Sequence, residues 1–282
     1  MIMDCHTHTK NSPDACNTVA ELYARAENMG LDVLAITDHC EVNRFFGAEH
    51  YTMQPKEYDT YDFGKDFEIS MRENTAMKAL ARKEKHKTEL LCGIELGQAP
   101  FDFDLAERII SDKRLDFVIG SIHQICGFDD FAFINYDEID VKYVLTKYFQ
   151  EMLSLCNWNR FDILAHITYP LRYIEGEKHI QVDMSVYRDI IAECFRVLIK
   201  NGKGIEINTS GFRQAYGKPL PTLEYVKLFK DLGGEVLSVG SDSHCTEDLG
   251  KGIPEAIELA KNVGFTELAF FKKRNPTFIS IK

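Results

Sequence analysis

Two histidines near the start of the chain have a spacing suited to metal binding. His6 and His8 follow the apolar pair Ile2-Met3. Residues two apart on a β-strand project from the same face, so a strand that ends in a pocket could present both imidazoles to one ion. The pattern recurs along the chain, because later short apolar runs also end on His, Asp or Glu.

The strand-like runs place a set of polar side chains at their carboxyl ends. These side chains are Asp4, His6, His8, Asp38, His39, Glu95, His123, His166, Asn208, Asp242 and His244. Six of the nine histidines belong to this set. If the strands are parallel and close into a barrel, all these ends face one mouth, where barrel enzymes have their active sites. The sequence therefore predicts one site, assembled from distant parts of the chain.

The predicted cluster has more ligands than a single ion needs. Six imidazoles together with Asp14, Glu95 and Asp242 give nine candidate side chains. A catalytic zinc ion uses about three protein ligands and keeps one position open, so this set fits two or three ions if one carboxylate bridges. Mixed imidazole and carboxylate ligands favour Zn²⁺, Mn²⁺ or Fe²⁺ over Ca²⁺. A lone strand-end histidine is more often a hydrogen-bonded core residue, but six at equivalent positions favour metal binding.

Strand-like and helix-like segments alternate along the chain. The expected strands are 2–5, 33–37, 90–94, 117–122, 163–165, 205–208, 236–240 and 268–271, and the expected helices are 19–29, 67–87, 105–111, 141–157, 184–201, 223–232 and 254–263. Thr18 is the expected N-cap of the first helix, with Glu21 at its third position, and Gly30 ends it. This alternation predicts a mainly parallel sheet, closed as a distorted (β/α) barrel of seven or eight units. An open doubly wound sheet is the alternative.

Composition and charge narrow the class of protein. The 282 residues are 45% hydrophobic, which suits one large domain, and the net charge of −11 argues against a nucleic-acid or anionic-membrane surface. No GxGxxG or GxxxxGK[ST] motif follows a predicted strand, and no apolar run reaches the roughly 18 residues of a membrane span. The eight cysteines form no CxxC pair and no signal peptide precedes them, so we expect reduced thiols in a cytoplasmic protein.

The strand-end motifs follow the order seen in a known family. The chain resembles the PHP (polymerase and histidinol phosphatase) family at His6-Thr7-His8, Thr37-Asp38-His39, Gly93-Ile94-Glu95, Gly120-Ser121-Ile122-His123, Ala165-His166 and Gly240-Ser241-Asp242-Ser243-His244. Segments 169–173 and 205–213 are similar to the histidinol-phosphate phosphatases within that family. The resemblance implies a distorted (β/α)7 barrel with a trinuclear metal centre, in a single domain over residues 1–282.

The resemblance also implies how the ligands are shared among the ions. The first ion would take His6, His8, Glu95 and Asp242; the second would share Glu95 and take His123 and His166; the third would take Asp14, His39 and His244. Many relatives have histidine where this chain has Asp14. A carboxylate also binds divalent ions, so the departure from the family pattern is mild.

The activity that the resemblance implies is hydrolysis of a phosphate monoester, with L-histidinol phosphate of histidine biosynthesis as the substrate. We expect a metal-bridging hydroxide to attack phosphorus in line with the leaving alkoxide. The expected catalytic residues are Glu95, Asp242, His244 and Arg213, with metal-bound water, Asp242 and His244 as candidates for the acid that protonates the alcohol. 

Substrate contacts are expected from Arg172, Arg213 and Asn208. A guanidinium fork matches two phosphoryl oxygens, so the two arginines are the candidate phosphate clamps; a surface ion pair is the alternative for each. Asn208 would contact substrate or orient a neighbouring side chain, and a strand-end cap is an equally good explanation.

Two long loops, 40–65 and 124–140, are candidate lids over this site. Their aromatic side chains could stack on an imidazole ring, and Glu41, Asp129 or Asp130 could meet an amine; ordinary loop packing is the alternative. Phosphotyrosine-protein or sugar-phosphate hydrolysis, nuclease activity and a decayed metal-binding scaffold also stay open, although the acidic composition opposes the nuclease. The sequence does not predict the oligomeric state.

Overall fold

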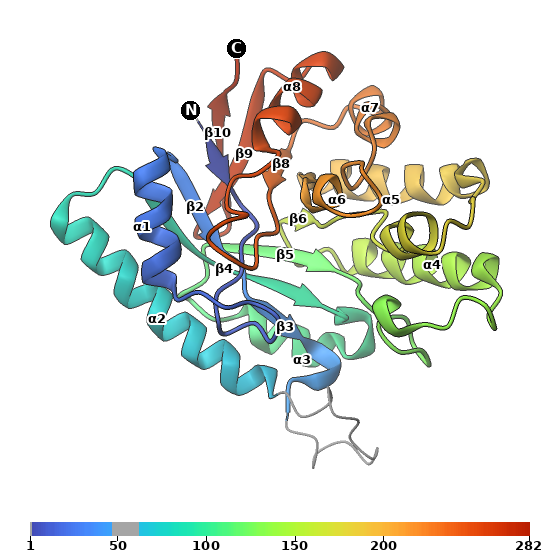
Figure 1. The fold of residues 1–282 in the computed structure, drawn as a ribbon, viewed down its shortest axis with the longest axis horizontal. Helices are drawn as coiled ribbons and strands as arrows, with labels where there is room; N and C mark the ends of the chain where they lie inside the picture. Colours follow the sequence, from blue (N-terminus) through green and yellow to red (C-terminus); the bar gives the residue numbers. More distant parts are fainter. Residues whose placement is uncertain (1, 47–61) are drawn as a thin grey trace.

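Seven parallel strands form the centre of the molecule (Figure 1). The computed structural model describes residues 2–46 and 62–282. Neighbouring strands follow the order β1-β2-β4-β5-β6-β7-β8. Their bounds are β1 Met3–Asp4, β2 Val33–Ile36, β4 Glu89–Gly97, β5 Phe117–Ser121, β6 Ile163–Leu164, β7 Gly204–Asn208 and β8 Leu237–Gly240.

The sheet closes because the segment around β8 returns to the segment around β1. Cys5 N donates a hydrogen bond to Val239 O at 3.0 Å, and His8 N donates to Ser243 O at 2.9 Å. These bonds produce a nearly complete barrel. The expected distorted (β/α)7 barrel is therefore confirmed, and the open doubly wound alternative is wrong. The extent of the domain, residues 1–282, stays a prediction.

A short strand that the sequence analysis did not predict extends the line of β2. This strand, β3 (His39–Glu41), pairs in parallel with the second half of β4, whereas β2 pairs with the first half. The two are interrupted only at Thr37 and Asp38. In this register His39 lies opposite Glu95, so the first residues of the expected 40–65 loop belong to the sheet and bring two motif residues side by side.

Helices cover the outside of the barrel. In Figure 1, α1 and α2 lie on one side of the strands, and α4 and α5 lie on the other. The expected first helix is confirmed: Thr18 Oγ1 accepts a hydrogen bond from Glu21 N, and Gly30 ends the helix with φ 72°. The helices are α1 Val19–Met29, α2 Phe63–Glu84, α3 Phe103–Ile110, α4 Val141–Trp158, α5 Arg188–Lys200, α6 Ser210–Arg213, α7 Leu223–Asp231 and α8 Ile253–Val263.

The two largest errors in the expected helix boundaries lie at helix starts. The segment 184–201 begins with a 3-10 turn, Met184–Tyr187, and only then continues as α5. The segment 67–87 begins earlier, at Phe63, because the Asp62 side chain accepts a hydrogen bond from Lys65 N and so caps the helix. Residues 47–61 of the first expected lid, with Tyr51, Tyr58 and Tyr61, lie outside the described residues.

The last expected strand is one arm of an antiparallel hairpin. β9 (Glu267–Lys272) pairs with β10 (Asn275–Ser280), a strand that the sequence analysis missed. The turn residue Arg274 contacts the Asp162 side chain and the carbonyl of Arg160, just before β6. Phe271 stacks on Phe117 with 5.3 Å between ring centroids. The hairpin turn therefore lies against the amino ends of the barrel strands and leaves the carboxyl ends open.

Five of the eight cysteines are buried and contribute to packing. Cys5 and Cys40 are buried in the main hydrophobic core, and all eight cysteines are free of disulfide bonds. Within residues 2–46 and 62–282, no helix is both long and apolar enough to cross a membrane.

Candidate metal centre

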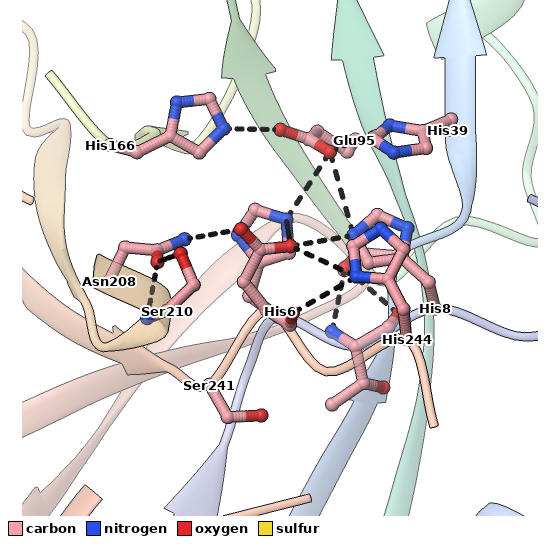
Figure 2. A network of polar contacts seen from close by, with 12 residues as sticks. His6, His8, His39, Glu95, His166, Asn208, Ser210, Ser241 and His244 are labelled. Atoms are coloured by element: carbon pink, nitrogen blue, oxygen red, sulfur yellow. Dashed lines mark hydrogen bonds and ion pairs between the residues drawn. The ribbon is translucent and has the colours of Figure 1, made fainter. Parts of the chain in front are cut away.

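The carboxyl ends of the barrel strands bring all nine predicted metal ligands into one cluster. Figure 2 shows the imidazoles of His6, His8 and His166 directed toward Glu95. Donor atoms lie within 4.8 Å of one another in four groups: His6, His8 and Asp242; His6, Glu95 and His166; His39, Glu95 and His123; and His8, His39 and His244. Asp14 joins the cluster through His39 and His244.

Glu95 occupies the middle of this cluster. Its Oε1 lies 2.7 Å from His166 Nε2 and 3.0 Å from His123 Nε2. Its Oε2 lies 3.3 Å from His6 Nε2 and 2.9 Å from His39 Nδ1. The Glu95 side chain is 1% exposed, and its two oxygens face different sets of imidazoles. A carboxylate that bridges two ions would have this arrangement.

Asp242 faces the two histidines of the first strand. Its Oδ1 lies 3.2 Å from His8 Nε2 and 3.7 Å from His6 Nε2. The backbone of Asp242 is left-handed, with φ 54°, a conformation that non-glycine residues adopt mainly where the surroundings impose it. Gly240, two residues before Asp242, lets the end of β8 lie close to His6. A Cβ at this position would overlap the His6 side chain.

The remaining three ligands lie at the solvent edge of the cluster. Asp14 Oδ2 is 3.1 Å from His244 Nε2, and Asp14 Oδ1 is 3.7 Å from His39 Nε2. The side chain of Asp14 is 61% exposed, whereas that of His6 is fully buried. The structure thus contains one deeply buried part of the cluster and one part that solvent reaches.

Several buried side-chain atoms that could bind a metal lack a hydrogen-bond partner. Among the described residues, His6 Nε2, His8 Nε2 and Glu95 Oε2 are buried and make no hydrogen bond. Each such atom destabilises a fold by about 1–3 kcal/mol unless something else satisfies it. Imidazole nitrogens and carboxylate oxygens are suitable ligands for Zn²⁺, Mn²⁺ and Fe²⁺. The residues present therefore fit a cluster of divalent ions.

Burial and neighbouring charges shift the pKa values of the cluster. Burial, followed by the nearby His244, lowers the pKa of His8 to about 3, so its imidazole is neutral at pH 7 and can donate a lone pair. Burial raises the pKa of Glu95, but His123 and His6 outweigh it and hold that pKa well below its usual value. Glu95 is therefore ionised, as a bridging ligand must be.

Two buried carboxylates that the sequence analysis did not assign to the cluster hold histidines from behind. Glu206 Oε2 lies 3.0 Å from His6 Nδ1, and Glu41 Oε1 lies 2.9 Å from His123 Nδ1. A Cβ on Gly97 would overlap the Glu41 carboxylate, so a glycine permits this approach. The position of Glu206 on β7, two residues before Asn208, is the signal that could have found it, since residues two apart share a face.

Arg213, one of the two expected phosphate clamps, supports the loop that carries Asp242. Its Nη2 donates to the carbonyl oxygens of Ser241 at 2.8 Å and Asp242 at 3.3 Å. Its Nε faces Asp248 Oδ2 at 3.3 Å, so the ion-pair alternative is present too. Its Nη1 is buried and makes no hydrogen bond to the described residues. This atom is the part of the guanidinium without a partner among those residues.

Arg172, the other expected clamp, packs on two aromatic rings. It begins a π-helical turn, Arg172–Glu177, and its guanidinium carbon is 5.1 Å from the ring centroid of Tyr169 and 5.2 Å from that of Tyr173. The Tyr169 ring in turn lies 5.1 Å from the His123 ring, centroid to centroid. Contacts with ring faces leave the edge of the guanidinium open to an anion.

Asn208 is fully engaged with protein atoms. Its Nδ2 donates to Glu206 Oε1 at 3.1 Å and to Asp242 Oδ2 at 3.2 Å. Its Oδ1 accepts from Ser210 N at 3.0 Å and from Ser210 Oγ at 2.6 Å. These contacts use both N–H groups and both lone pairs of the amide. They favour the orienting and capping roles of Asn208 over the expected substrate contact.

A pocket of about 260 Å³ opens beside the exposed edge of the cluster. Its lining includes Asp14, His39 and His123 of the cluster, the carboxylates of Glu41 and Asp130, and the rings of Phe133 and Tyr169. Asp130 caps a short 3-10 turn, Phe131–Phe133, in the second expected lid. The 124–140 loop therefore lines the space next to the candidate ions.

Comparisons with known proteins identify relatives of similar length and fold. A Thermotoga maritima protein named probable histidinol-phosphatase is 27% identical over 97% of both chains. A Lactococcus lactis protein named histidinol-phosphatase is 27% identical over 95% of this chain and 94% of its own. The crystal structure of the Lactococcus lactis histidinol phosphate phosphatase, complexed with Zn, L-histidinol and phosphate, has the same fold, with a TM-score of 0.75 and 23% identity over 98% of both chains. Residues 4–210 match the PHP domain family, and the chain belongs to that family.

Proposed function

We propose that the protein hydrolyses L-histidinol phosphate to L-histidinol and phosphate, using two or three bound Zn²⁺, Mn²⁺ or Fe²⁺ ions. The observation that carries this proposal is the cluster of nine candidate ligands, with Glu95 at its centre, beside a pocket with acidic and aromatic walls. The names of the relatives that match nearly the whole chain support the same activity. The proposed partner is thus a small phosphate monoester, and the net charge of −11 opposes a nucleic-acid substrate.

The ligands are assigned to three ions in this proposal. His6, His8, Glu95 and Asp242 hold the first; Glu95, His123 and His166 hold the second; Asp14, His39 and His244 hold the third. The placement of His39 Nδ1 at 2.9 Å from Glu95 connects the third group to the other two. When bound, such ions activate a water molecule and neutralise the phosphoryl oxygens.

The chain's own residues would bind the phosphate and supply the proton. Arg172 offers the edge of its guanidinium, and Arg213 offers Nη1 while it holds the Asp242 loop. The two candidates to hold the proton for the leaving alcohol are Asp242 and His244. His244 is the more accessible, with 27% of its side chain exposed against 8% for Asp242.

The pocket favours histidinol phosphate over a sugar phosphate. Its walls contain the carboxylates of Glu41 and Asp130 and the rings of Phe133 and Tyr169. L-Histidinol carries an ammonium group and an imidazole ring, which suit carboxylates and aromatic faces, whereas a sugar phosphate carries neither. Burial raises the pKa of Asp130, and a bound cation would favour its ionised form.

Steady-state hydrolysis of L-histidinol phosphate, compared with phosphotyrosine, a sugar phosphate and p-nitrophenyl phosphate in Mn²⁺ and Zn²⁺, tests this function. We expect kcat/KM for histidinol phosphate to exceed the others by at least about a hundredfold, or ~2.7 kcal/mol. A smaller preference would remove histidinol phosphate from the proposal and leave a metal-dependent phosphatase.

Asp130→Asn locates the source of the preference. It should lower kcat/KM for histidinol phosphate by about tenfold, because a charge-assisted contact is lost, and leave the sugar phosphate and p-nitrophenyl phosphate, which carry no ammonium group, unchanged. Asp137→Asn, an exposed carboxylate of the same loop outside the pocket, is the matched control. Equal losses for all esters would show that Asp130 supports the loop and does not select the substrate.

The free cysteines and the biosynthetic substrate also support a cytoplasmic location in this proposal.

A further inference from the structure

Glu206 lies behind the metal cluster, inside β7, and its side chain is 2% exposed. Its two oxygens lie 3.0 and 3.2 Å from His6 Nδ1. Oε1 also accepts hydrogen bonds from His166 N at 2.9 Å and from Asn208 Nδ2 at 3.1 Å. One buried carboxylate thus contacts residues at the ends of three different strands.

Glu206 has no permanent cation to compensate it. Within the described residues, the charged partner within 4.0 Å is His6, and neither lysine nor arginine approaches. A buried carboxylate without a partner is strongly destabilising, so its contacts to His6 and to two N–H donors matter for the fold around the site. Both of its oxygens are used by protein donors, and it faces Nδ1, whereas the cluster lies on the Nε2 side of the ring. Glu206 is therefore placed behind a ligand and is not itself a ligand.

We propose that Glu206 is a positioning residue that aligns one ligand in each of three strand-end segments at once. By accepting from Nδ1–H it fixes the tautomer of His6 in which Nε2 has a free lone pair toward Glu95 and Asp242. Glu206 also accepts a hydrogen bond from the backbone N–H of His166 and so positions the start of the segment that carries the His166 imidazole. Through Asn208, which donates to Asp242 Oδ2 at 3.2 Å, it also orients the carboxylate after β8.

The inference rests on the proposed metal centre, and its first test is metal affinity in Glu206→Gln. The amide keeps the shape of the side chain but has no charge and presents an NH₂ group to at least one of its three donors. Competition with a chelator should show Zn²⁺ or Mn²⁺ binding weakened by about 10–100-fold, the usual loss when a partner behind a metal-bound histidine is removed. Glu206→Asp keeps the charge and should recover part of this affinity.

Asp162→Asn is the matched control, because Asp162 is also a buried strand-associated carboxylate but lies at the opposite end of the barrel. It should destabilise the protein and leave metal affinity unchanged. Unchanged affinity in Glu206→Gln, or a loss no larger than in Asp162→Asn, would overturn the proposal.

A second measurement needs no variant and so does not depend on one folding. In the zinc-loaded protein, nitrogen NMR of the His6 ring should show a protonated Nδ1 and a metal-bound Nε2; the opposite tautomer would contradict the assignment. A parent protein that binds ions but does not prefer histidinol phosphate would end the proposed function and leave this inference standing. A parent that binds no divalent ion would end the inference.

Discussion

The two ends of the barrel both bury carboxylates, but they compensate them in different ways. At the amino end, Asp116 pairs with Lys78, and Asp162 contacts Arg274, with Lys203 at 3.7 Å. At the carboxyl end, Glu95 and Asp242 are buried as well. Among the described residues, these two carboxylates form ion pairs only with histidines.

This difference separates a structural end from a functional one. Lysine and arginine keep their protons at any physiological pH, so the amino end is complete without a ligand. An imidazole can give up its proton and bind a metal through the same nitrogen. The carboxyl end is therefore built so that divalent ions can take the place of protons. The predictions below test whether the two ends are as independent as this contrast implies.

The largest effect is expected from His6→Ala. Loss of this fully buried ligand should lower kcat by at least about a thousandfold, the upper end for one electrostatic contact, because metal binding is disrupted. Metal analysis should show fewer bound ions, and circular dichroism should show a folded barrel. His86→Ala is the control, since His86 pairs with Glu27 and Glu84 outside the cluster. Full metal content in His6→Ala would contradict its assignment as a ligand.

Removing a phosphate clamp should have the next largest effect. Arg172→Ala should lower kcat/KM by about 10²–10³-fold with unchanged metal content, since the Arg172 guanidinium packs on aromatic rings and, among the described residues, forms no hydrogen bond or ion pair with a candidate ligand. Arg213→Ala should lower both activity and metal content, because Arg213 also holds the carbonyl oxygen of Asp242. Arg160→Ala, a change at the amino end of the barrel, is the control for both the kinetics and the metal content. Activity within about threefold of the parent would remove the clamp role from either arginine.

Asp14→Ala should have a smaller effect. The Asp14 side chain is 61% exposed, so solvent screens its charge, and we expect about tenfold weaker binding of the outermost ion, or ~1.4 kcal/mol. Titration with Mn²⁺ should show the loss in the weakest of the binding steps. Asp14→His, which supplies another ligand, should restore that step. Loss of all ions in Asp14→Ala would show that the exposed and buried parts of the cluster bind as one unit.

The sequence predicts which side chains gather at the barrel mouth because all but Asp14 follow a short apolar run. In a parallel barrel such positions all reach the same mouth, and the order of motifs identifies the family. The rule is less successful for Asn208, whose amide contacts protein atoms, and for Glu206. Glu206 stands between Ile205 and Ile207 inside a strand, and the strand-end rule does not include it. Its role depends on the ring of His6, which is distant in sequence and reaches it only through closure of the barrel.

The short elements were also beyond sequence patterns. β3 has three residues, too few for a recognisable alternation, and exists because β4 is long enough to pair with two successive strands. β10 contains Pro276 and several exposed residues, so its sequence alone does not predict a strand. The amino end of the barrel was likewise not anticipated, since its ion pairs join a helix, three strand starts and the hairpin turn.

The smallest effect on turnover, and the strictest test of the contrast between the ends, is expected from Asp162→Asn. This change leaves Arg274 facing a neutral amide in a buried position, which should lower the free energy of unfolding by about 3 kcal/mol. Because Asp162 shares no partner with the metal ligands, kcat should stay within about twofold of the parent wherever the protein is folded. Urea unfolding with and without Zn²⁺ should show the same loss in both conditions, since an effect confined to one end adds to ligand stabilisation at the other. If the loss differs between the two conditions, the ends are coupled through the strands that join them, and the amino end must be counted as part of the site.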